Sequence, residues 1–415
     1  MEKLTAFVQE HIADDLTRLV LDRKKWPDID LDLAVSCIQS RRKLKDKVHD
    51  WYMNPELIFP VSLSAEQCSS TATGIYKAEL ALNIAGNIPF RLADLTGGLG
   101  VDSWYFSQKA SQVWYHEMQE KLCTAAKHNF QKLNAENIFV RNLISTPETI
   151  EEIISDARPD IVYMDPARRG EGGKKVFLIE ECTPDVLTLK EQIFKHCRHI
   201  LIKLSPMADI TMVCSRLGSA CREVHVVAYG GECKELLIWM DREWNREYSI
   251  TAVEISRLAS LARNDGIATL SSKDTPLSSQ ATSLSSRAQS RDLFLFEPGK
   301  ALMKAGFFDL IRDYFGIEKM GVSTHYYLTD DESKVDDLKK FGKVYSIISI
   351  QPLDKRTIKA AGAAYHRAEV TARNIPMDTE TFRKKLGVTS GDDAHIFGLK
   401  SDSLGNLLII GKRSV

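Results

Sequence analysis

Short apolar runs alternate with amphipathic segments from residue 61 to residue 245, and this alternation constrains the fold more than any other feature of the chain. The apolar runs have the length of strands, and the segments between them repeat apolar residues at helical spacing. Strands that alternate with helices predict a parallel sheet wound by helices on both faces. The runs that we expect to form its strands are 90–95, 113–116, 138–140, 161–164 and 200–204.

Two further runs, 224–229 and 235–240, flank the dipeptide Gly230-Gly231 and predict an antiparallel pair of strands at the end of the sheet. This terminal pair argues against a dinucleotide-binding domain. The glycine spacing argues against it as well, because the chain lacks G-x-G-x-x-G after its first strand.

The rest of the chain divides by composition. Residues 1–60 repeat apolar residues at three- and four-residue steps and predict a helical N-terminal region. Residues 246–291 are predicted to be a connector, because their last part, 271–291, holds eight Ser and two Thr among 21 positions. Such a segment cannot bury enough apolar surface to offset its ordering entropy, which predicts a flexible stretch. Residues 292–415 mix strand-like and helical runs and predict a separate α+β region.

The charge of the chain limits the classes of partner that it can bind. Its 415 residues carry 55 Lys and Arg against 56 Asp and Glu, a net charge of −1, which excludes a uniformly basic nucleic-acid coat. Any contact with RNA must come from a local patch, and residues 343–415 hold 12 basic and 7 acidic residues. No run approaches the roughly 18 apolar residues that span a bilayer, and the N-terminus lacks the pattern of a signal peptide. We therefore expect a cytoplasmic protein with no membrane partner, and the Cys and His spacings predict no metal site.

A glycine-rich loop gives the strongest functional signal. The run from Asp94 to Gly100 (DLTGGLG) follows the first predicted strand. Glycine lets the backbone approach a ligand closely and adopt a positive φ. Glu117 ends the second strand, 23 residues after Asp94, where an acid can accept hydrogen bonds from both hydroxyls of a ribose. Loops at the carboxyl ends of parallel strands form one crevice, so these residues predict a nucleoside-containing ligand.

Two more loops lead into the same predicted crevice. Arg141-Asn142 follows the third strand, where an adenine ring could lie. Asp165-Pro166-Ala167-Arg168 follows the fourth strand, where a substrate should meet the cofactor.

These residues together resemble class I S-adenosylmethionine-dependent methyltransferases. The run 94–100 is similar to their first motif, Glu117 to their ribose-binding acid, and 165–168 to their catalytic loop. Upstream, 66–71 and 76–78 look like the segment that RNA-modifying members fold over the cofactor. The resemblance implies an α/β fold, a Rossmann-like seven-stranded domain over 61–245, and S-adenosylmethionine as cofactor. The cofactor residues that it implies are Asp94, Thr96, Gly97, Gly98, Gly100, Glu117, Met118, Asn142 and Asp165.

The C-terminal region resembles the THUMP-like domain attached to such methyltransferases in bacteria. The likeness rests on 372–376 (ARNIP) and 384–387 (KKLG), and 294–309 looks like the ferredoxin-like unit that precedes this domain. We therefore expect a ferredoxin-like unit at 292–342 and a THUMP-like domain at 343–415. True THUMP domains bind RNA, usually tRNA, so the resemblance implies a structured RNA as partner, with tRNA favoured over rRNA.

The catalytic loop permits direct methyl transfer. Transfer is an in-line displacement, so the enzyme mainly holds donor and acceptor close and aligned. Asp165 with the Pro166 carbonyl suits an acceptor nitrogen, which makes an RNA base the predicted target. Amino-group methyltransferases carry an aromatic residue where this chain has Arg168, and Arg can also stack on a base. The expected catalytic residues are Asp165, Pro166, Ala167 and Arg168.

A covalent mechanism is not expected. The sequence D-P-A-R is also similar to the loop of RNA 5-methyluridine methyltransferases, which need a cysteine nucleophile after the fifth strand. In this chain 203–209 reads KLSPMAD and contains no cysteine. The residues expected to bind substrate are Arg169, Lys203, Ser205, Arg373, Lys384 and Lys385.

Two other interpretations stay open on the sequence alone. One is an RNA-binding protein whose methyltransferase fold is catalytically inactive, for which cofactor affinity is the discriminating observation. The other is a small-molecule methyltransferase, against which a salt-sensitive RNA complex would argue.

Overall fold

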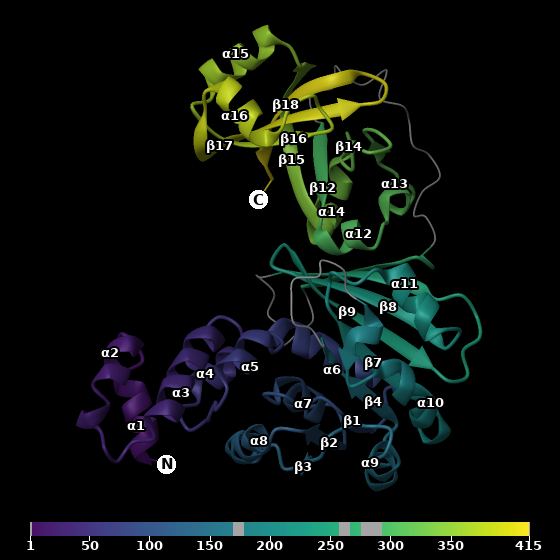
Figure 1. The fold of residues 1–415 in the computed structure, drawn as a ribbon. Coiled ribbons are helices and arrows are strands. Elements are labelled where there is room, and N and C mark those ends of the chain that lie inside the picture. Colours follow the sequence, from purple (N-terminus) through teal and green to yellow (C-terminus); the bar gives the residue numbers. More distant parts are fainter. Residues whose placement is uncertain (1, 169–177, 257–265, 275–292, 415) are drawn as a thin grey trace. The chain divides into compact units, whose positions relative to one another are not determined.

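The computed structural model describes residues 2–168, 178–256, 266–274 and 293–414. The chain forms two compact units. The first unit contains Met1–Val224 with Glu235–Tyr248, and the second contains His225–Lys234 with Ser249–Val415. Figure 1 shows the elements of both units along the chain.

The first unit begins with helices, because short polar residues cap amphipathic runs there. Asp15 accepts backbone N–H bonds at the start of α2, Asp30 does so for α3, and Ser70 forms a capping box with Thr73 at the start of α6. The helices of this region are α1 (Glu2–Glu10), α2 (Leu16–Leu21), α3 (Leu31–Leu44), α4 (His49–Met53), α5 (Ser62–Gln67) and α6 (Thr71–Ile84).

The seven predicted strands lie in a nine-stranded sheet, in the order β3-β2-β1-β4-β7-β9-β8. Strand β1 pairs in parallel with β2 and β4, β2 with β3, and β4 with β7, whereas β9 runs antiparallel to β7. The predicted parallel sheet with an antiparallel terminal pair is confirmed. These strands are β1 (Arg91–Asp94), β2 (Gln112–Glu117), β3 (Ile138–Asn142), β4 (Ile161–Met164), β7 (His199–Leu204), β8 (Cys221–Tyr229) and β9 (Glu232–Asp241).

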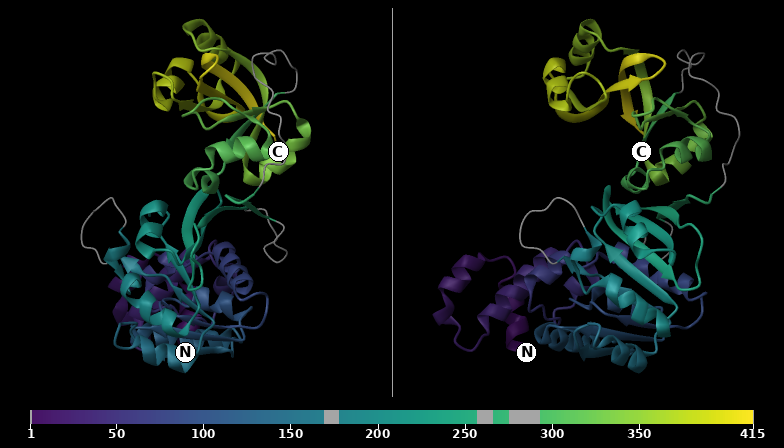
Figure 2. Two further views of the ribbon diagram at one scale, coloured as in Figure 1. Left: turned by 90° about the vertical axis from the view of Figure 1, so that its right-hand side faces the viewer. Right: turned by 45° about the vertical axis from the view of Figure 1, so that its right-hand side comes forward.

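Helices connect these strands and cover the sheet, which is visible in Figures 1 and 2. The central strand β4 is buried along its whole length, as expected for a parallel strand covered on both faces. The connecting helices are α7 (Val101–Ser107), α8 (Glu120–Lys132), α9 (Ile150–Ala157), α10 (Val186–His196) and α11 (Ile210–Leu217).

The segment 246–291, predicted as a connector, contains two strands. Strands β10 (Ser249–Ile255) and β11 (Ile267–Ser271) pair antiparallel, and β10 lies next to β8 in the sheet order. The sequence did not reveal these strands. Strand β10 buries apolar side chains at Ala252 and Val253 on consecutive positions, so it lacks the alternating pattern that marks a strand, and the Ser-rich composition further along favoured a connector. Most of the predicted flexible stretch, 275–291, lies outside the described residues.

The second unit contains a seven-stranded sheet with the order β13-β14-β12-β15-β18-β17-β16. Strand β12, from the expected ferredoxin-like unit, pairs antiparallel with β15, from the expected THUMP-like domain. The two parts therefore share one sheet. Its strands are β12 (Phe294–Pro298), β13 (Glu318–Lys319), β14 (Tyr327–Thr329), β15 (Gly342–Pro352), β16 (Arg367–Arg373), β17 (Thr389–Ser401) and β18 (Gly405–Arg413).

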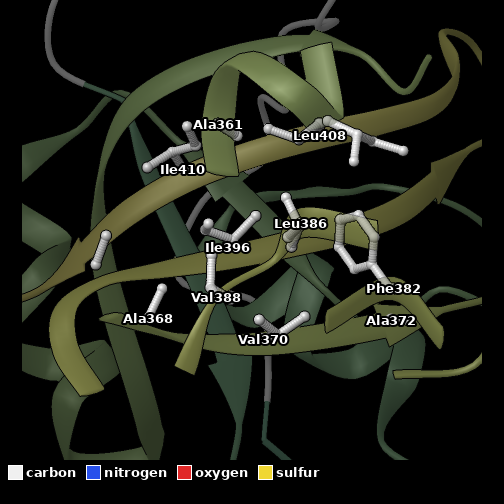
Figure 3. Packing of buried hydrophobic residues seen from close by; sticks show 12 residues of the cluster. Ala361, Ala368, Val370, Ala372, Phe382, Leu386, Val388, Ile396, Leu408 and Ile410 are labelled. Carbon is white, nitrogen blue, oxygen red and sulfur yellow. The ribbon is translucent and has the colours of Figure 1, made fainter. Parts of the chain in front are cut away.

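The helices of the second unit pack on this sheet. Figure 3 shows the core between the sheet and α15 and α16, where Phe382 and Leu386 contact side chains such as Ile396 and Leu408 of the strands. These residues are buried, so this core anchors the C-terminal part of the chain. The helices are α12 (Lys300–Lys304), α13 (Phe308–Phe315), α14 (Val335–Phe341), α15 (Lys355–Ala364) and α16 (Thr379–Leu386).

A close helix contact in this core gives a testable prediction. A Cβ atom at Gly362 of α15 would overlap the carbonyl oxygen of Leu386 at the end of α16. We therefore expect Gly362→Ala to destabilise this core by about 1–3 kcal/mol, the usual cost of overpacking. Amide hydrogen exchange of α15 and α16 in the full chain measures this, and Ala363→Ser at the neighbouring exposed position serves as control. Equal exchange in wild type and Gly362→Ala would contradict the contact.

Candidate functional site

The glycine loop connects β1 to α7, and each glycine has its own physical reason. Gly98 and Gly100 have φ values of 54° and 92°, in the left-handed region that favours glycine. Gly97 has no room for a side chain, because a Cβ there would overlap the ring of Tyr115 on β2. The loop is therefore built for close backbone approach at three nearby positions.

Strand β2 holds this loop in place. The Tyr115 hydroxyl donates to the carbonyl oxygen of Gly98 at 2.6 Å, and the Gly97 N–H donates to the carbonyl oxygen of His116 at 2.8 Å. The Glu117 carboxylate accepts the Gly98 N–H at 3.0 Å through Oε2 and the Gln119 N–H at 2.8 Å through Oε1. Each carboxylate oxygen can accept a further bond, so Glu117 can bind a ligand while it holds the loop.

Asp94 lies fully buried at the end of β1. Its carboxylate accepts the Thr96 N–H at 2.9 Å and the Ser103 hydroxyl at 2.6 Å, which ties β1 to the loop and to α7. Burial raises the pKa of Asp94 to about 7, against the lowering effect of these hydrogen bonds, and the nearby carboxylates of Asp102 and Asp165 raise it further.

One cavity of about 250 Å³ joins most of the predicted residues at the carboxyl ends of β1, β2, β4 and β7. Its lining also includes Ser69, which belongs to the predicted cofactor-covering segment 66–71, and Asp102, Tyr163, Thr183 and Pro184, which were not predicted from the sequence. The predicted site residues among the lining are Asp94, Thr96, Gly97, Gly98, Gly100, Glu117, Met118, Asp165, Ala167 and Lys203.

The other predicted residues lie elsewhere. Asn142 does not line the cavity; its Nδ2 donates to the carbonyl oxygens of Glu117 and Met118, so it fixes the end of β2. Pro166 and Ser205 are also outside the lining. Arg168 belongs to a short strand, and Arg169 lies outside the described residues. Arg373, Lys384 and Lys385 belong to the second unit.

The catalytic loop is fixed at its backbone. The Asp165 N–H donates to Thr96 Oγ1 at 2.6 Å, which joins this loop to the glycine loop. Strand β5 (Ala167–Arg168) then pairs antiparallel with β6 (Cys182–Thr183). Ala167 and Thr183 both line the cavity, so this pairing forms part of its wall.

The structure also brings together a cluster of charges that the sequence analysis did not predict. We call Lys77, Asp102, Asp165, Lys203 and Glu235 the buried charge cluster. The side chain of Lys77 is 0% exposed, and its Nζ lies 2.7 Å from Glu235 Oε1 and 3.3 Å from Asp102 Oδ1. Lys203 Nζ donates to Asp165 Oδ2 at 2.6 Å and lies 3.8 Å from Asp102 Oδ2. A lysine within the apolar run HILIKL of β7 is the sequence signal that pointed to such a role.

Two polar side chains complete the cluster. Ser69 Oγ accepts from Lys77 Nζ at 2.9 Å and from Lys203 Nζ at 3.3 Å. The Tyr163 hydroxyl donates to Asp102 Oδ2 at 2.7 Å. The cluster thus connects α6, α7, β4, β7 and β9 beneath the cavity.

The electrostatics of the cluster follow from burial and pairing. Burial alone would lower the pKa of Lys203, but Asp165, Asp102 and Glu235 outweigh it and raise that pKa above its usual value. Burial would raise the pKa of Asp102, but Lys77 and Lys203 lower it overall. Lys203 therefore remains an ammonium group beside the cavity.

Membrane-spanning helices and clusters of metal-ligating side chains are both absent from the described part of the chain. No helix there is long and apolar enough to cross a membrane. Among the same residues, no group of three or more His, Cys, Asp and Glu side chains is placed to hold a metal ion.

Comparisons with known proteins bear on the fold and the domains of the chain. Two family models match the chain, THUMP domain-like at residues 342–413 and ferredoxin-like domain at residues 294–334. A solved structure described as a putative methyltransferase from Porphyromonas gingivalis W83 is 26% identical, with a TM-score of 0.79, and the match covers 100% of this chain and 98% of that one. The predicted fold class, and the resemblance to a methyltransferase with a C-terminal THUMP-like domain, are confirmed.

Two other solved structures match less than half of the chain. An rRNA methylase from Streptococcus thermophilus is 12% identical over 39% of this chain and 94% of its own, with a TM-score of 0.29. The 16S rRNA N2 G1207 methyltransferase of T. thermophilus, in complex with AdoMet and guanosine, is 15% identical over 43% of this chain and 44% of its own, with a TM-score of 0.33. Likenesses at this level do not bear on the reaction. A search of curated proteins found no match.

The raised pKa of Asp94 gives a prediction about stability. Because this pKa is about 7 in the folded chain and 3.8 ordinarily, the folded chain binds the proton more tightly. The contribution of Asp94 to stability therefore falls as pH rises from about 4 to about 7 and is constant above that. We expect the free energy of unfolding of Asp94→Asn, relative to wild type, to increase with pH across this window. Urea denaturation at pH 5, 6, 7 and 8 measures it, and a difference independent of pH would contradict the assignment.

Proposed function

We propose that the chain is an S-adenosylmethionine-dependent methyltransferase that acts on RNA. The observation that carries the proposal is one cavity whose lining contains the glycine loop, Glu117 and Asp165 together. This is the arrangement that a nucleoside cofactor and a reacting substrate require in an open α/β sheet. The full-length likeness to the Porphyromonas gingivalis protein supports it.

The residues present fit this cofactor. Gly98 carries no side chain that would fill the space beside the loop, and Glu117 retains acceptor capacity for ribose hydroxyls. Met118 is 60% exposed beside Glu117 and offers an apolar surface for a base. When bound, S-adenosylmethionine supplies a methyl group on a sulfonium for in-line displacement. Asp165 then lies where the methyl acceptor has to be held.

Transfer is direct in this proposal. The described residues that line the cavity include one cysteine, Cys68, and burial raises the pKa of its thiol to about 11. A thiol with so high a pKa is a poor nucleophile, because the thiolate is the reactive form. Cys197 and Cys214, on either side of the region after β7, are buried and do not line the cavity.

RNA is the proposed substrate because of the second unit. Residues 342–413 match the THUMP domain-like model, and the same part of the chain carries the surplus of basic residues. Lys384 and Lys385 extend from the last turn of α16, and Arg373 ends β16. The resemblance favours a tRNA over an rRNA. Phosphate contacts supply most of the non-specific affinity in such complexes.

The cofactor site can be tested by ligand-induced stabilisation. We expect S-adenosylhomocysteine to raise the melting temperature of the full chain in a saturable way. At a concentration of 100 times its Kd, the ligand should add about 2.7 kcal/mol to the free energy of unfolding. Gly98→Asp should abolish this shift, because it puts a side chain and a negative charge on the loop beside Glu117.

The matched control is Gly86→Asp. Gly86 also has a positive φ, 75°, and a Cβ there meets nothing within 4 Å, but it lies at the end of α6 away from the cavity. This variant should bind the ligand as wild type does. Absence of any shift at millimolar ligand would contradict the enzyme proposal and favour the inactive-fold alternative.

The RNA surface can be tested by charge reversal. We expect Lys384→Glu with Lys385→Glu to weaken binding of bulk tRNA and to reduce the slope of log affinity against log salt by about one to two. The control is Lys339→Glu with Lys340→Glu, which reverses two lysines in the last turn of α14. Filter binding from 50 to 200 mM salt measures both, and equal losses in the two variants would reject α16 as an RNA contact.

A further inference from the structure

Only part of the buried charge cluster reaches the cavity. The side chains of Lys77 and Glu235 are 0% and 4% exposed and do not line it. Lys203 and Asp165 do line it, with side chains that are 11% and 38% exposed. The methyl acceptor must therefore lie against an ammonium group and a carboxylate that are paired with each other.

Both groups of this pair keep hydrogen-bonding capacity. The bonds from Lys203 Nζ to Asp165 and Ser69 use two of its three N–H groups. Asp165 accepts through Oδ2, and Oδ1 has no hydrogen-bond partner among the described residues. One donor and one acceptor are therefore available side by side.

This combination selects among the acceptor groups of a nucleotide. A hydroxyl oxygen can accept a hydrogen bond from an ammonium and donate one to a carboxylate at the same time. An exocyclic amine of a base only donates, so it would face the ammonium of Lys203 with N–H groups. An unprotonated ring nitrogen only accepts, so it would leave the Asp165 oxygen without a partner.

The lining of the cavity agrees with this selection. Among its described residues only Tyr163 is aromatic, and its ring is buried against Phe106 at a centroid distance of 4.9 Å. The described lining therefore presents no open aromatic face on which a target base could stack. A base drawn out of its stack is normally held between aromatic or apolar side chains, and this lining lacks the aromatic kind.

We propose that the methyl acceptor is a hydroxyl oxygen, the ribose 2′-OH of an RNA nucleotide, bound between Lys203 Nζ and Asp165 Oδ1. This rests on the proposed function and replaces the RNA base that the sequence predicted as target. In the reaction the hydroxyl oxygen forms a bond to the methyl carbon, and the carbon–sulfur bond breaks with its electron pair on sulfur. The hydroxyl proton passes to the Asp165 carboxylate and then to solvent, to which Asp165 is partly exposed.

Lys203 stabilises the oxygen as it loses its proton. The pKa of Lys203 is held above its usual value by the surrounding carboxylates, despite burial, so the group acts as a fixed positive charge. Removal of one such donor from an oxyanion typically costs a factor of about 100–1000 in rate.

The experiment locates the methyl group. Full-chain protein is incubated with tritiated S-adenosylmethionine and in vitro transcribed bacterial tRNA and rRNA, which carry no prior methylation. The product is then hydrolysed in alkali, which cleaves RNA next to every free 2′-OH. We expect label in alkali-resistant dinucleotides, and we expect a transcript with a 2′-deoxy nucleotide at the mapped position to lose it.

The outcomes separate the two proposals. Label in mononucleotides, on the base, would overturn the hydroxyl acceptor and leave RNA methylation intact. No label in any RNA, with S-adenosylhomocysteine binding intact, would overturn RNA methylation itself and the hydroxyl acceptor with it.

Variants test the two residues separately. We expect Lys203→Met and Asp165→Asn each to reduce the rate at least 100-fold while the thermal shift with S-adenosylhomocysteine is kept. Lys203→Arg should recover part of the rate, because it restores the positive charge and the donors. Lys195→Met, an exposed lysine on α10, is the control. Wild-type rates in Lys203→Met would overturn the role of this pair.

Discussion

The buried ammonium of Lys77 is the interaction on which the arrangement around the cavity depends. A charge removed from water costs several kcal/mol unless partners of opposite charge and hydrogen-bond acceptors surround it. Lys77 has Glu235, Asp102 and Ser69 within 3.3 Å, and Glu235 lies 158 residues away in the sequence. Helix α6, helix α7 and strand β9 must therefore meet in one arrangement, because any other would leave Lys77 unpaired.

This constraint extends to the residues that face the cavity. Asp102 lies in the first turn of α7, directly after the glycine loop, where a carboxylate is favoured by the helix dipole. It binds the Tyr163 hydroxyl on β4 and lies near Lys203 on β7, and Lys203 binds Asp165. The same charges that anchor α7 thus fix the distance between the glycine loop and the catalytic loop. A site whose supporting contacts are fixed in this way is ready to bind without rearrangement.

The order of strands and helices along the chain was enough to predict the sheet and the loops at its edge. Contacts between residues far apart in the sequence could not be predicted. The alternation of strands and helices placed Asp94, Glu117 and Asp165 at one edge of the sheet, because carboxyl ends of parallel strands share an edge. The sequence could not show that Lys77 pairs with Glu235, since nothing local marks the two as neighbours. It also missed β10 and β11, whose weak apolar pattern gains its stability from neighbouring strands.

The ammonium group of Lys203 beside Asp165 changes which methyl acceptor the loop after β4 can hold. A carboxylate alone after β4 suits an acceptor nitrogen, but an ammonium at 2.6 Å makes the same position suited to an oxygen. Energetics point the same way. A base drawn from its stack costs a few kcal/mol, and stacking on an aromatic side chain normally returns about 1–3 kcal/mol. The described lining of this cavity has no open aromatic face that could offset the free-energy cost of unstacking a base. A ribose hydroxyl already lies on the outside of the RNA backbone, so its methylation requires no unstacking.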